Sequence, residues 1–240
     1  MSKIYWDAGH GGTDPGACAN GLKEKDLALK VVKHACTYMK KTYVCDVYQD
    51  ITDDSTTAIS NRANKWEADL FVSVHFNAGG GDGYEALVYG NSNLKLGRCF
   101  EKRVKAIGQN SRGVKYRPDL NVLRLTSMKA ILNECAFIDN KTDIKDWDED
   151  DELQKMGEAL AKACADWLNL KMKKAISSAP KEYKVKVPLG TNVYKEARAN
   201  SAIVNYITNP GVFTIVETIG NYGRLKSGAG WINVKRTTKL

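Results

Sequence analysis

Two hydrophobic patterns alternate along the first 170 residues. Short apolar runs predict strands at 3–7, 44–48, 70–75, 84–89, 121–125 and 130–134. Between them, apolar residues recur every three to four positions and predict helices over 24–41, 56–68, 94–109 and 150–170. Strands that alternate with helices in this way indicate an α/β domain, with a mostly parallel sheet covered by helices on both faces.

The pattern changes after residue 172. Residues 173–181 (KKAISSAPK) end the last helix and predict a linker. Short β-rich runs follow at 183–187, 203–207, 213–219, 222–225 and 231–234, separated by Gly and Asn turns. We therefore expect a first domain over 1–172 and a small all-β barrel over 182–240.

Charge divides the chain at the same place. Residues 1–172 carry 24 Lys/Arg and 25 Asp/Glu (net −1), and residues 173–240 carry 12 and 3 (net +9), which together give the net charge of +8. A basic module favours an acidic polymer as its partner, such as nucleic acid, anionic lipid or an anionic cell-wall polymer. The tail has no helical recognition element and no obvious face of stacking aromatics, so we expect no nucleic-acid binding.

Other features of the sequence narrow the class of protein. There is no run of about 18 apolar residues, so no membrane span is expected. The first residues carry no apolar signal region, which predicts a cytoplasmic protein, at least initially. The six cysteines form no C-x-x-C pair and are predicted to be buried or half-buried thiols. The acidic run 146–152 precedes a helix and is expected to favour its dipole rather than to bind metal.

Three residues stand out as candidate metal ligands. His10 and His75 each lie at or just after the end of a predicted strand, and Glu24 lies at the start of the first helix. In parallel sheets such positions meet at one edge. Two imidazoles and one carboxylate are a ligand set for a catalytic zinc ion, with a fourth position left for water.

A fourth ionisable residue, Glu134, ends the apolar strand 130–134 and is the candidate general acid/base. Partial burial would raise its pKa toward the range in which a carboxyl group can exchange a proton with water. Asn77 lies two residues after His75 and is expected to orient a ligand or bind substrate.

Each of these residues also has an ordinary structural explanation. A histidine in a turn, a glutamate in the first turn of a helix and a charge at a strand end are all common without function. The signal lies in their combination on one predicted edge. The third histidine, His34, lies within a helical pattern and is expected to be structural, and Asp7 and Asp14 are expected to be turn residues or to support the ligands.

Five runs together carry a resemblance to a known family. They are 7–16 (DAGHGGTDPG), 21–27 (GLKEKDL), 60–64 (SNRAN), 73–78 (SVHFNA) and 130–140 (AILNECAFIDN). In this order they resemble the zinc-dependent N-acetylmuramoyl-L-alanine amidases of the amidase-3 family, which occur in bacterial autolysins and phage endolysins. The resemblance covers residues 3–170.

This resemblance implies that His10, Glu24 and His75 bind zinc and that Glu134 is the catalytic acid/base. The implied reaction is hydrolysis of the amide between N-acetylmuramic acid and L-alanine in peptidoglycan. Ala8 and Lys129 replace prolines that are common in the family, and Asn133 replaces an aliphatic residue. None of the three is a ligand, so the departures affect local loop shape only.

The tail resembles the bacterial SH3-like modules that follow such catalytic domains, most clearly over 223–234 (GRLKSGAGWINV). This implies a cell-wall-binding module, with Trp231 as a candidate contact and anionic wall polymers as candidate partners. A stabilising or dimerising appendage is the alternative.

Together these features predict a phage or prophage endolysin that stays in the cytoplasm until it is released to the wall. A bacterial autolysin that is exported by another route fits the same features. Three other functions stay open on the residues alone. They are a zinc peptidase acting on peptidoglycan stem peptides, a wall-binding protein without catalysis, and a nucleic-acid binder, against which the features of the tail already argue.

Overall fold

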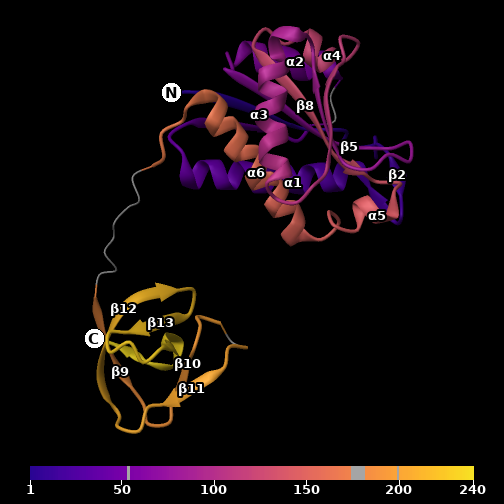
Figure 1. The fold of residues 1–240 in the computed structure, drawn as a ribbon. Coiled ribbons are helices and arrows are strands. Elements are labelled where there is room, and N and C mark those ends of the chain that lie inside the picture. Colours follow the sequence, from indigo (N-terminus) through magenta and orange to yellow (C-terminus); the bar gives the residue numbers. More distant parts are fainter. Residues whose placement is uncertain (53–54, 174–181, 199) are drawn as a thin grey trace. The chain divides into compact units, whose positions relative to one another are not determined.

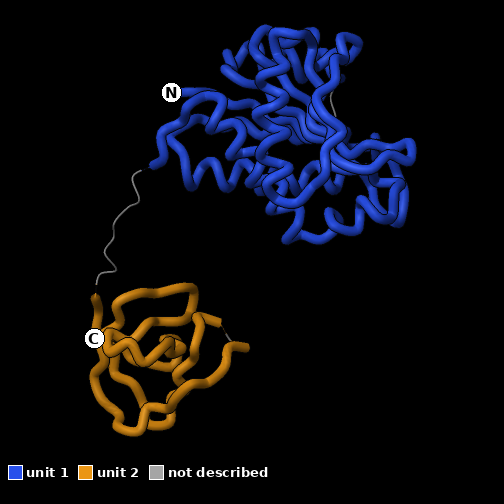
Figure 2. Tube along the Cα trace, in the orientation of Figure 1, with its two compact units in different colours: residues 1–173 blue, residues 174–240 orange. Residues whose placement is uncertain are grey.

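The computed structural model describes residues 1–52, 55–173, 182–198 and 200–240. The chain divides into two compact units, Met1–Lys173 (unit 1) and Lys174–Leu240 (unit 2) (Figures 1 and 2). Most of the predicted linker, 174–181, lies outside the described residues. No helix in the described ranges has the length and apolar character needed to span a membrane.

A six-stranded sheet is the centre of unit 1. Its strand order is β4-β1-β5-β8-β6-β7. The strands are β1 (Lys3–Ala8), β4 (Asp46–Asp50), β5 (Leu70–Asn77), β6 (Tyr84–Val88), β7 (Ser111–Tyr116) and β8 (Lys129–Phe137). The first four in this order run parallel, β6 runs antiparallel to β8, and β7 is parallel to β6. The predicted α/β domain with a mostly parallel sheet is confirmed, and the sheet is mixed at one side.

Three long helices cover one face of this sheet (Figure 1). They are α1 (Glu24–Thr42), α3 (Leu94–Lys105) and α6 (Asp150–Leu168). Buried residues of α1 recur at helical spacing, as in Leu27, Val31 and Ala35, and they pack on strand residues such as Trp6 and Val72. Gly157 lets α6 approach α1 closely, because a Cβ at this position would lie 2.6 Å from the carbonyl oxygen of Val31.

The other face carries only two short helices, α2 (Thr56–Lys65) and α4 (Asn121–Arg124). Their residues Ile59, Ala63 and Val122 pack on Phe71 and Leu132 of the sheet. Ser55 caps α2 by accepting a hydrogen bond from the Ala58 backbone N–H. These helices cover the face only in part, and the candidate site lies on the same face of the sheet.

The remaining elements of unit 1 are short: β2 (Cys18–Ala19), β3 (Leu22–Lys23), a 3₁₀ turn at Asn91–Asn93 and α5 (Lys141–Ile144). One expectation from sequence was wrong here, and two features were not predicted. Residues 121–125 form the short helix α4 rather than a strand. The edge strand β7 was not predicted, and β8 continues three residues beyond Glu134.

Unit 2 is all-β, as predicted. One sheet contains β9 (Tyr183–Val187), β10 (Asn192–Tyr194), β11 (Ile203–Tyr206), β12 (Gly211–Ile219), β13 (Tyr222–Leu225), β14 (Trp231–Asn233) and β15 (Thr238–Lys239) in the order β11-β10-β14-β13-β12-β9-β15. It has its own core, which includes Val185, Val193, Ile215 and Ile232. The more specific expectation of an SH3-like barrel stays a prediction.

Candidate metal centre

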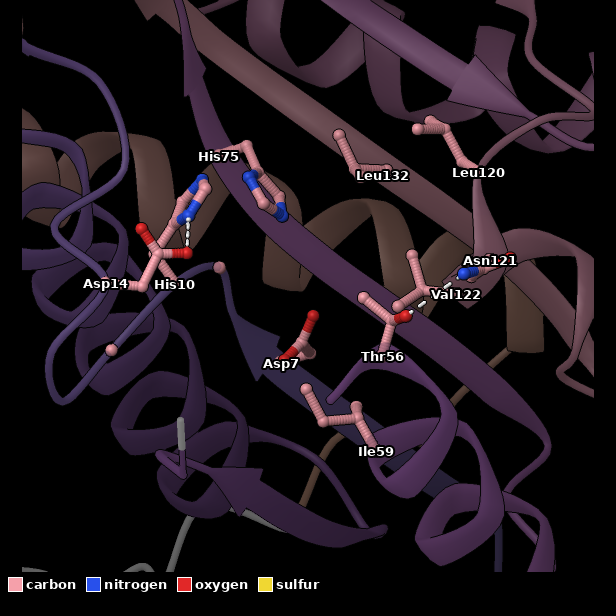
Figure 3. Close-up of a pocket in the computed structure, with 12 residues that line it drawn as sticks. Asp7, His10, Asp14, Thr56, Ile59, His75, Leu120, Asn121, Val122 and Leu132 are labelled. Atoms are coloured by element: carbon pink, nitrogen blue, oxygen red, sulfur yellow. Dashed lines mark hydrogen bonds and ion pairs between the residues drawn. The ribbon is translucent and has the colours of Figure 1, made fainter. Parts of the chain in front are cut away.

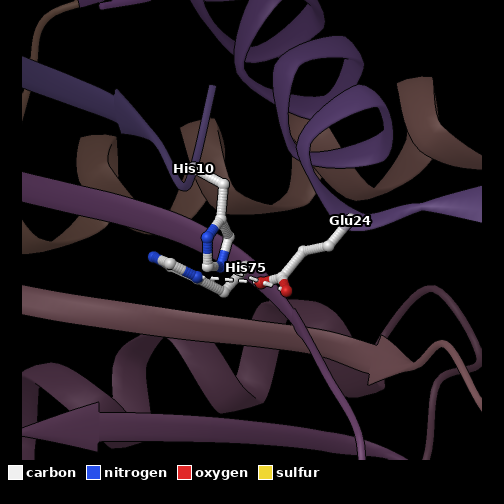
Figure 4. A group of neighbouring side chains, drawn as sticks. All are labelled: His10, Glu24 and His75. Carbon is white, nitrogen blue, oxygen red and sulfur yellow. Dashed lines mark hydrogen bonds and ion pairs between the residues drawn. The ribbon is translucent and has the colours of Figure 1, made fainter. Parts of the chain in front are cut away.

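His10, Glu24 and His75 come together beside one end of the sheet (Figure 4). His10 follows β1, Glu24 opens α1, and His75 lies near the end of β5. One ligand atom from each residue lies within 4.8 Å of the others. The structure therefore brings together the three residues that the sequence singled out.

The carboxylate of Glu24 lies between the two imidazoles. Its Oε2 is 3.1 Å from Nε2 of His10, and its Oε1 is 2.9 Å from Nδ1 of His75. Donor atoms bound to one tetrahedral zinc ion at about 2.0–2.2 Å lie roughly 3.3 Å apart. The two separations involve different oxygens of Glu24, and with all three ligand atoms within 4.8 Å of one another the side chains are close enough to share one ion.

Further contacts fix the orientation of His10 and Glu24. Nδ1 of His10 lies 2.8 Å from Oδ2 of Asp14, which leaves Nε2 facing Glu24. Glu24 also accepts backbone hydrogen bonds from Ala17 and Phe76, at 2.9 and 3.1 Å. The carboxylate of Asp14 fixes the tautomer and the ring orientation of His10, as is common around metal-binding histidines.

Glycines make room for the two imidazole rings. A Cβ at Gly9 would lie 2.3 Å from the ring of His75. A Cβ at Gly16 would lie 2.6 Å from the ring of His10 and 2.7 Å from Glu24 Oε2. His10 itself has a positive φ of 61° in the tight turn after β1, a conformation that is uncommon outside glycine.

The electrostatics of the trio follow from its contacts. The hydrogen bond to Glu24, helped by Asp14, raises the pKa of His10 to about 9 despite its burial. Burial alone would raise the pKa of Glu24, but the hydrogen bonds from both histidines outweigh it and the pKa lies far below its usual value. Without a cation, the negative charge of Glu24 therefore holds protons on the imidazoles, and a metal ion would have to displace them.

Glu134 lies beside the trio on the next strand. It is in register with His75 of β5 on one side and with Glu85 of β6 on the other. Its Oε2 is fully buried and contacts no hydrogen-bond partner among the described residues. Burial raises the pKa of Glu134 to about 7. A carboxyl group with this pKa can take up and release a proton near neutral pH.

A cavity of about 230 Å³ extends from the two histidines toward α2 and α4 (Figure 3). Apolar side chains line much of it, including Ile59, Leu120 and Leu132. Asp7 lies at its wall, buried, and accepts a hydrogen bond from Ser73 at 2.6 Å. The cavity gives the metal centre an adjoining space for part of a substrate.

A match to a family model identifies the chain. Residues 4–166, more than half of the chain, match the model Amidase_3, described as N-acetylmuramoyl-L-alanine amidase. The chain belongs to the amidase-3 family.

Several relatives of this amidase-3 chain have names that agree with this assignment. The endolysin of Bacillus phage SPP1 is 43% identical over 198 residues, which cover 76% of this chain and 72% of that protein. The N-acetylmuramoyl-L-alanine amidase CwlM of Bacillus licheniformis is 35% identical, over 71% of this chain and 70% of the relative.

Solved structures show the same fold. The catalytic domain of CwlV from Bacillus (Paenibacillus) polymyxa superposes with a TM-score of 0.67 at 24% identity, covering 71% of this chain and all of that domain. Cwp6 from Clostridium difficile gives a TM-score of 0.64 at 29% identity, over 69% of this chain and 29% of Cwp6. The residues that match the family model, 4–166, lie within unit 1.

The role expected for Asn77, to orient a ligand or to bind substrate, stays a prediction. Strand β5 does extend to Asn77, but the pairing with β8 is irregular between His75 and Asn77. Its Nδ2 donates to Glu85 Oε2 at 3.2 Å, and its Oδ1 accepts from the Ala78 backbone N–H. Asn77 therefore supports Glu85, and none of the hydrogen bonds of its side chain within the described ranges goes to His10, Glu24 or His75.

Sequence reasoning missed Glu85 and its partners in this amidase-3 domain. Glu85 is only 5% exposed and accepts from Arg112 Nε at 2.6 Å and Lys115 Nζ at 2.5 Å. Burial would raise the pKa of Glu85, but the two cations outweigh it and lower the pKa. An isolated glutamate in an apolar strand was the one available signal, because a buried carboxylate requires a cationic partner.

Other residues singled out from the sequence have structural places. His34 contacts Asp150 at 3.1 Å, at the start of α6. Asp150, Asp151 and Glu152 occupy the first turn of α6, where negative charge favours the helix dipole. Five cysteines are buried or half-buried as expected, but Cys18 is exposed, since it lies on the short β2–β3 hairpin.

Unit 2 of the amidase-3 chain has its own surface cavity, of about 400 Å³. Its walls include Asn192, Tyr194, Tyr222, Asn233 and Arg236. The two tyrosine rings meet edge to face, with their centroids 5.5 Å apart. Trp231, the residue expected to contact the wall, is half-buried on β14 and is not among the residues that line this cavity.

Proposed function

We propose that unit 1 hydrolyses the amide bond between the lactyl group of N-acetylmuramic acid and L-alanine in peptidoglycan, with zinc held by His10, Glu24 and His75. As a member of the amidase-3 family, the chain is an N-acetylmuramoyl-L-alanine amidase that acts on peptidoglycan. The proposal adds the metal, its ligands and the proton carrier. The observation that carries it is the position of Glu134, which pairs in register with His75 and whose buried Oε2 has no hydrogen-bond partner among the described residues.

The donor set fits zinc. Two imidazole nitrogens and one carboxylate, with ligand atoms within 4.8 Å of one another, are three protein ligands of the kind that leave a fourth position for water. Asp14 and two backbone N–H groups support the ligands, as is usual around zinc. A zinc ion bound here would supply a Lewis acid that polarises the scissile carbonyl and makes water acidic.

Glu134 supplies the proton transfers. Its deprotonated carboxylate accepts a proton from the attacking water, which raises the nucleophilicity of the oxygen. The same carboxyl group then donates that proton to the amine of L-alanine as the bond breaks. A pKa of about 7 suits both steps, because neither form of the carboxyl group is strongly favoured near neutral pH.

Mass spectrometry of digested cell walls tests the bond that is cut. Incubation with the enzyme should release stem peptides with a free L-alanine amine and leave glycan with free lactyl carboxylates. New termini within the stem peptide, with the lactyl amide intact, would instead indicate a zinc peptidase and overturn the proposal.

Metal analysis tests the ligands and the role of Glu134. The purified protein should hold one zinc ion per chain, and His75→Ala should lower zinc content and activity together. Glu134→Gln keeps the shape of the side chain but cannot accept the proton, so it should retain zinc and lose wall lysis. Retention of lysis by Glu134→Gln would rule out the proposed proton carrier.

We also propose that unit 2 binds the cell wall. Its cavity combines two aromatic rings, two amides and a guanidinium group, a set that suits wall glycan or peptide. Six cations form no ion pair with any residue in the described ranges: Lys184, Lys186, Lys195, Lys235, Arg236 and Lys239. This excess of positive charge supports an additional attraction to anionic wall polymers.

A further inference from the structure

The salt-bridge cluster beside the proposed proton carrier has features of a ligand site. Glu85 is buried, and its Oε1 accepts from both Arg112 and Lys115, while its Oε2 accepts from Asn77. The cationic side chains are 42% and 40% exposed. Two cations on one carboxylate leave a net positive charge of one at the surface.

A β-bulge brings the two cations to the same side. Tyr84 and Ala86 of β6 pair with Ser111 and Val114 of β7, so β7 contains one extra residue. Residues 112 and 115 are an odd number of positions apart and would point to opposite faces of a regular strand. Because of the extra residue, the side chains of 112 and 115 point to the same face. Gly113 permits the bulge, since its φ of 90° is a conformation that favours glycine. Bulges often re-aim side chains next to active sites.

Arg112 is held firmly but keeps free donors. It uses Nε toward Glu85, and its guanidinium carbon lies 5.3 Å from the centre of the Phe137 ring. No described residue accepts a hydrogen bond from its two terminal nitrogens. An anchored guanidinium with free N–H groups is suited to bind a carboxylate with little loss of side-chain entropy.

Arg112 and Lys115 contact a residue that lies one strand away from Glu134, the proposed proton carrier at the bond that is cut. Glu85 is the register partner of Glu134, which is in turn the register partner of His75. Adjacent strands are about 4.8 Å apart, so cations that reach back to Glu85 stand about one to two residues of extended peptide from Glu134. The glycan carries no carboxylate at this distance on the peptide side. The stem peptide does, because its second residue, D-glutamate, is linked through its side chain and leaves the α-carboxylate free.

We propose that Arg112 and Lys115 form a carboxylate-binding subsite that recognises the α-carboxylate of the second residue of the stem peptide. This inference rests on the proposed amidase function. It assigns the β6–β7 side of the site to the peptide. It also makes the charge of that residue a determinant of specificity, since amidation of the α-carboxylate replaces an anion with a neutral group.

Two soluble substrates test the subsite in the full-length enzyme: N-acetylmuramoyl-L-Ala-D-Glu and its α-amide. The enzyme should cleave the acid with a kcat/KM about tenfold higher than the amide, mainly through a lower KM. Arg112→Gln should reduce this ratio to near one, and Arg112→Lys should restore part of it. Lys115→Gln should lower the ratio independently, and in each variant Glu85 keeps one cationic partner, so the fold should persist.

Arg103→Gln is the matched control. Arg103 also pairs with a carboxylate, Asp166, and is 38% exposed, but it lies on α3 against the opposite face of the sheet. This variant should keep the wild-type ratio. Equal cleavage of the two substrates by the wild type, or an unchanged ratio in Arg112→Gln, would overturn the subsite. If the wild type cuts neither substrate at the lactyl amide, the amidase proposal itself fails.

Discussion

At the scale of single residues, Glu134 lowers the stability of the metal-free folded state at the pH values where its buried carboxyl group is ionised. Its pKa is raised from an ordinary value near 4.5 to about 7 by burial, so the folded protein holds a proton that the unfolded chain releases. The stability from this proton is fully present below about pH 4.5 and is lost as the pH rises through 7. Glu134→Gln should therefore stabilise the metal-free protein at pH 8 by up to about 3 kcal/mol.

Thermal unfolding of metal-stripped protein at pH 5 and pH 8 measures this difference. The gain from Glu134→Gln should be large at pH 8 and small at pH 5, since the wild-type carboxyl group is mostly protonated there. Zinc should reduce the gain at pH 8, because a nearby cation favours the ionised carboxylate. A gain of equal size at both pH values would show that burial of charge is not its cause.

Sequence reasoning found the residues whose chemistry is local and missed those that depend on pairing. His10, Glu24, His75 and Glu134 stand at element ends within distinctive runs, so their meeting could be predicted from topology alone. The contacts of Arg112 and Lys115 could not, because they depend on one extra residue in a strand that carries no clear apolar alternation. The hydrogen bond from Asn77 to Glu85 could not be predicted for a related reason, because strand pairing becomes irregular after His75.

At the scale of elements, the segment between β1 and α1 shapes the metal centre. Gly16 has a φ of 65°, and an added Cβ would contact both His10 and Glu24 at under 3 Å. Gly16→Ala should therefore displace two proposed ligands and lower zinc affinity by about tenfold, in addition to a loss of about 1 kcal/mol from backbone strain. Competition with a chromogenic chelator measures the affinity.

Gly21→Ala separates strain from displacement. Gly21 lies in the same segment between β1 and α1 and has a φ of 79°, but a Cβ there would meet no atom within 4 Å. This variant should lose similar stability and keep its zinc affinity. If both variants bind zinc like the wild type, the close approach at Gly16 does not position the ligands.

The longer elements of unit 1 were predictable because their apolar periodicity extends over many residues, as in α1 and β5. The helical conformation of the short run 121–125 could not be predicted. Its residues Val122 and Leu123 are buried, which explains the apolar run, but they pack from the side of α2 as one turn of helix. Short apolar runs do not distinguish a strand from a helical turn.

At the scale of the whole molecule, the two units have separate cores and separate proposed tasks. Substitution of the unit 2 cavity should therefore change wall binding without changing the chemistry in unit 1. In the full-length protein, the double variant Tyr222→Ala, Arg236→Gln should bind purified walls about tenfold more weakly in a pelleting assay, because it removes an aromatic ring and an unpaired cation. Its turnover of a small soluble muropeptide should equal that of the wild type.

Arg198→Gln is the matched control, since Arg198 is exposed, pairs with Glu196 and lies outside the cavity. Unchanged pelleting of the double variant would exclude this cavity as the wall-binding site, and an equal loss in Arg198→Gln would attribute binding to overall charge.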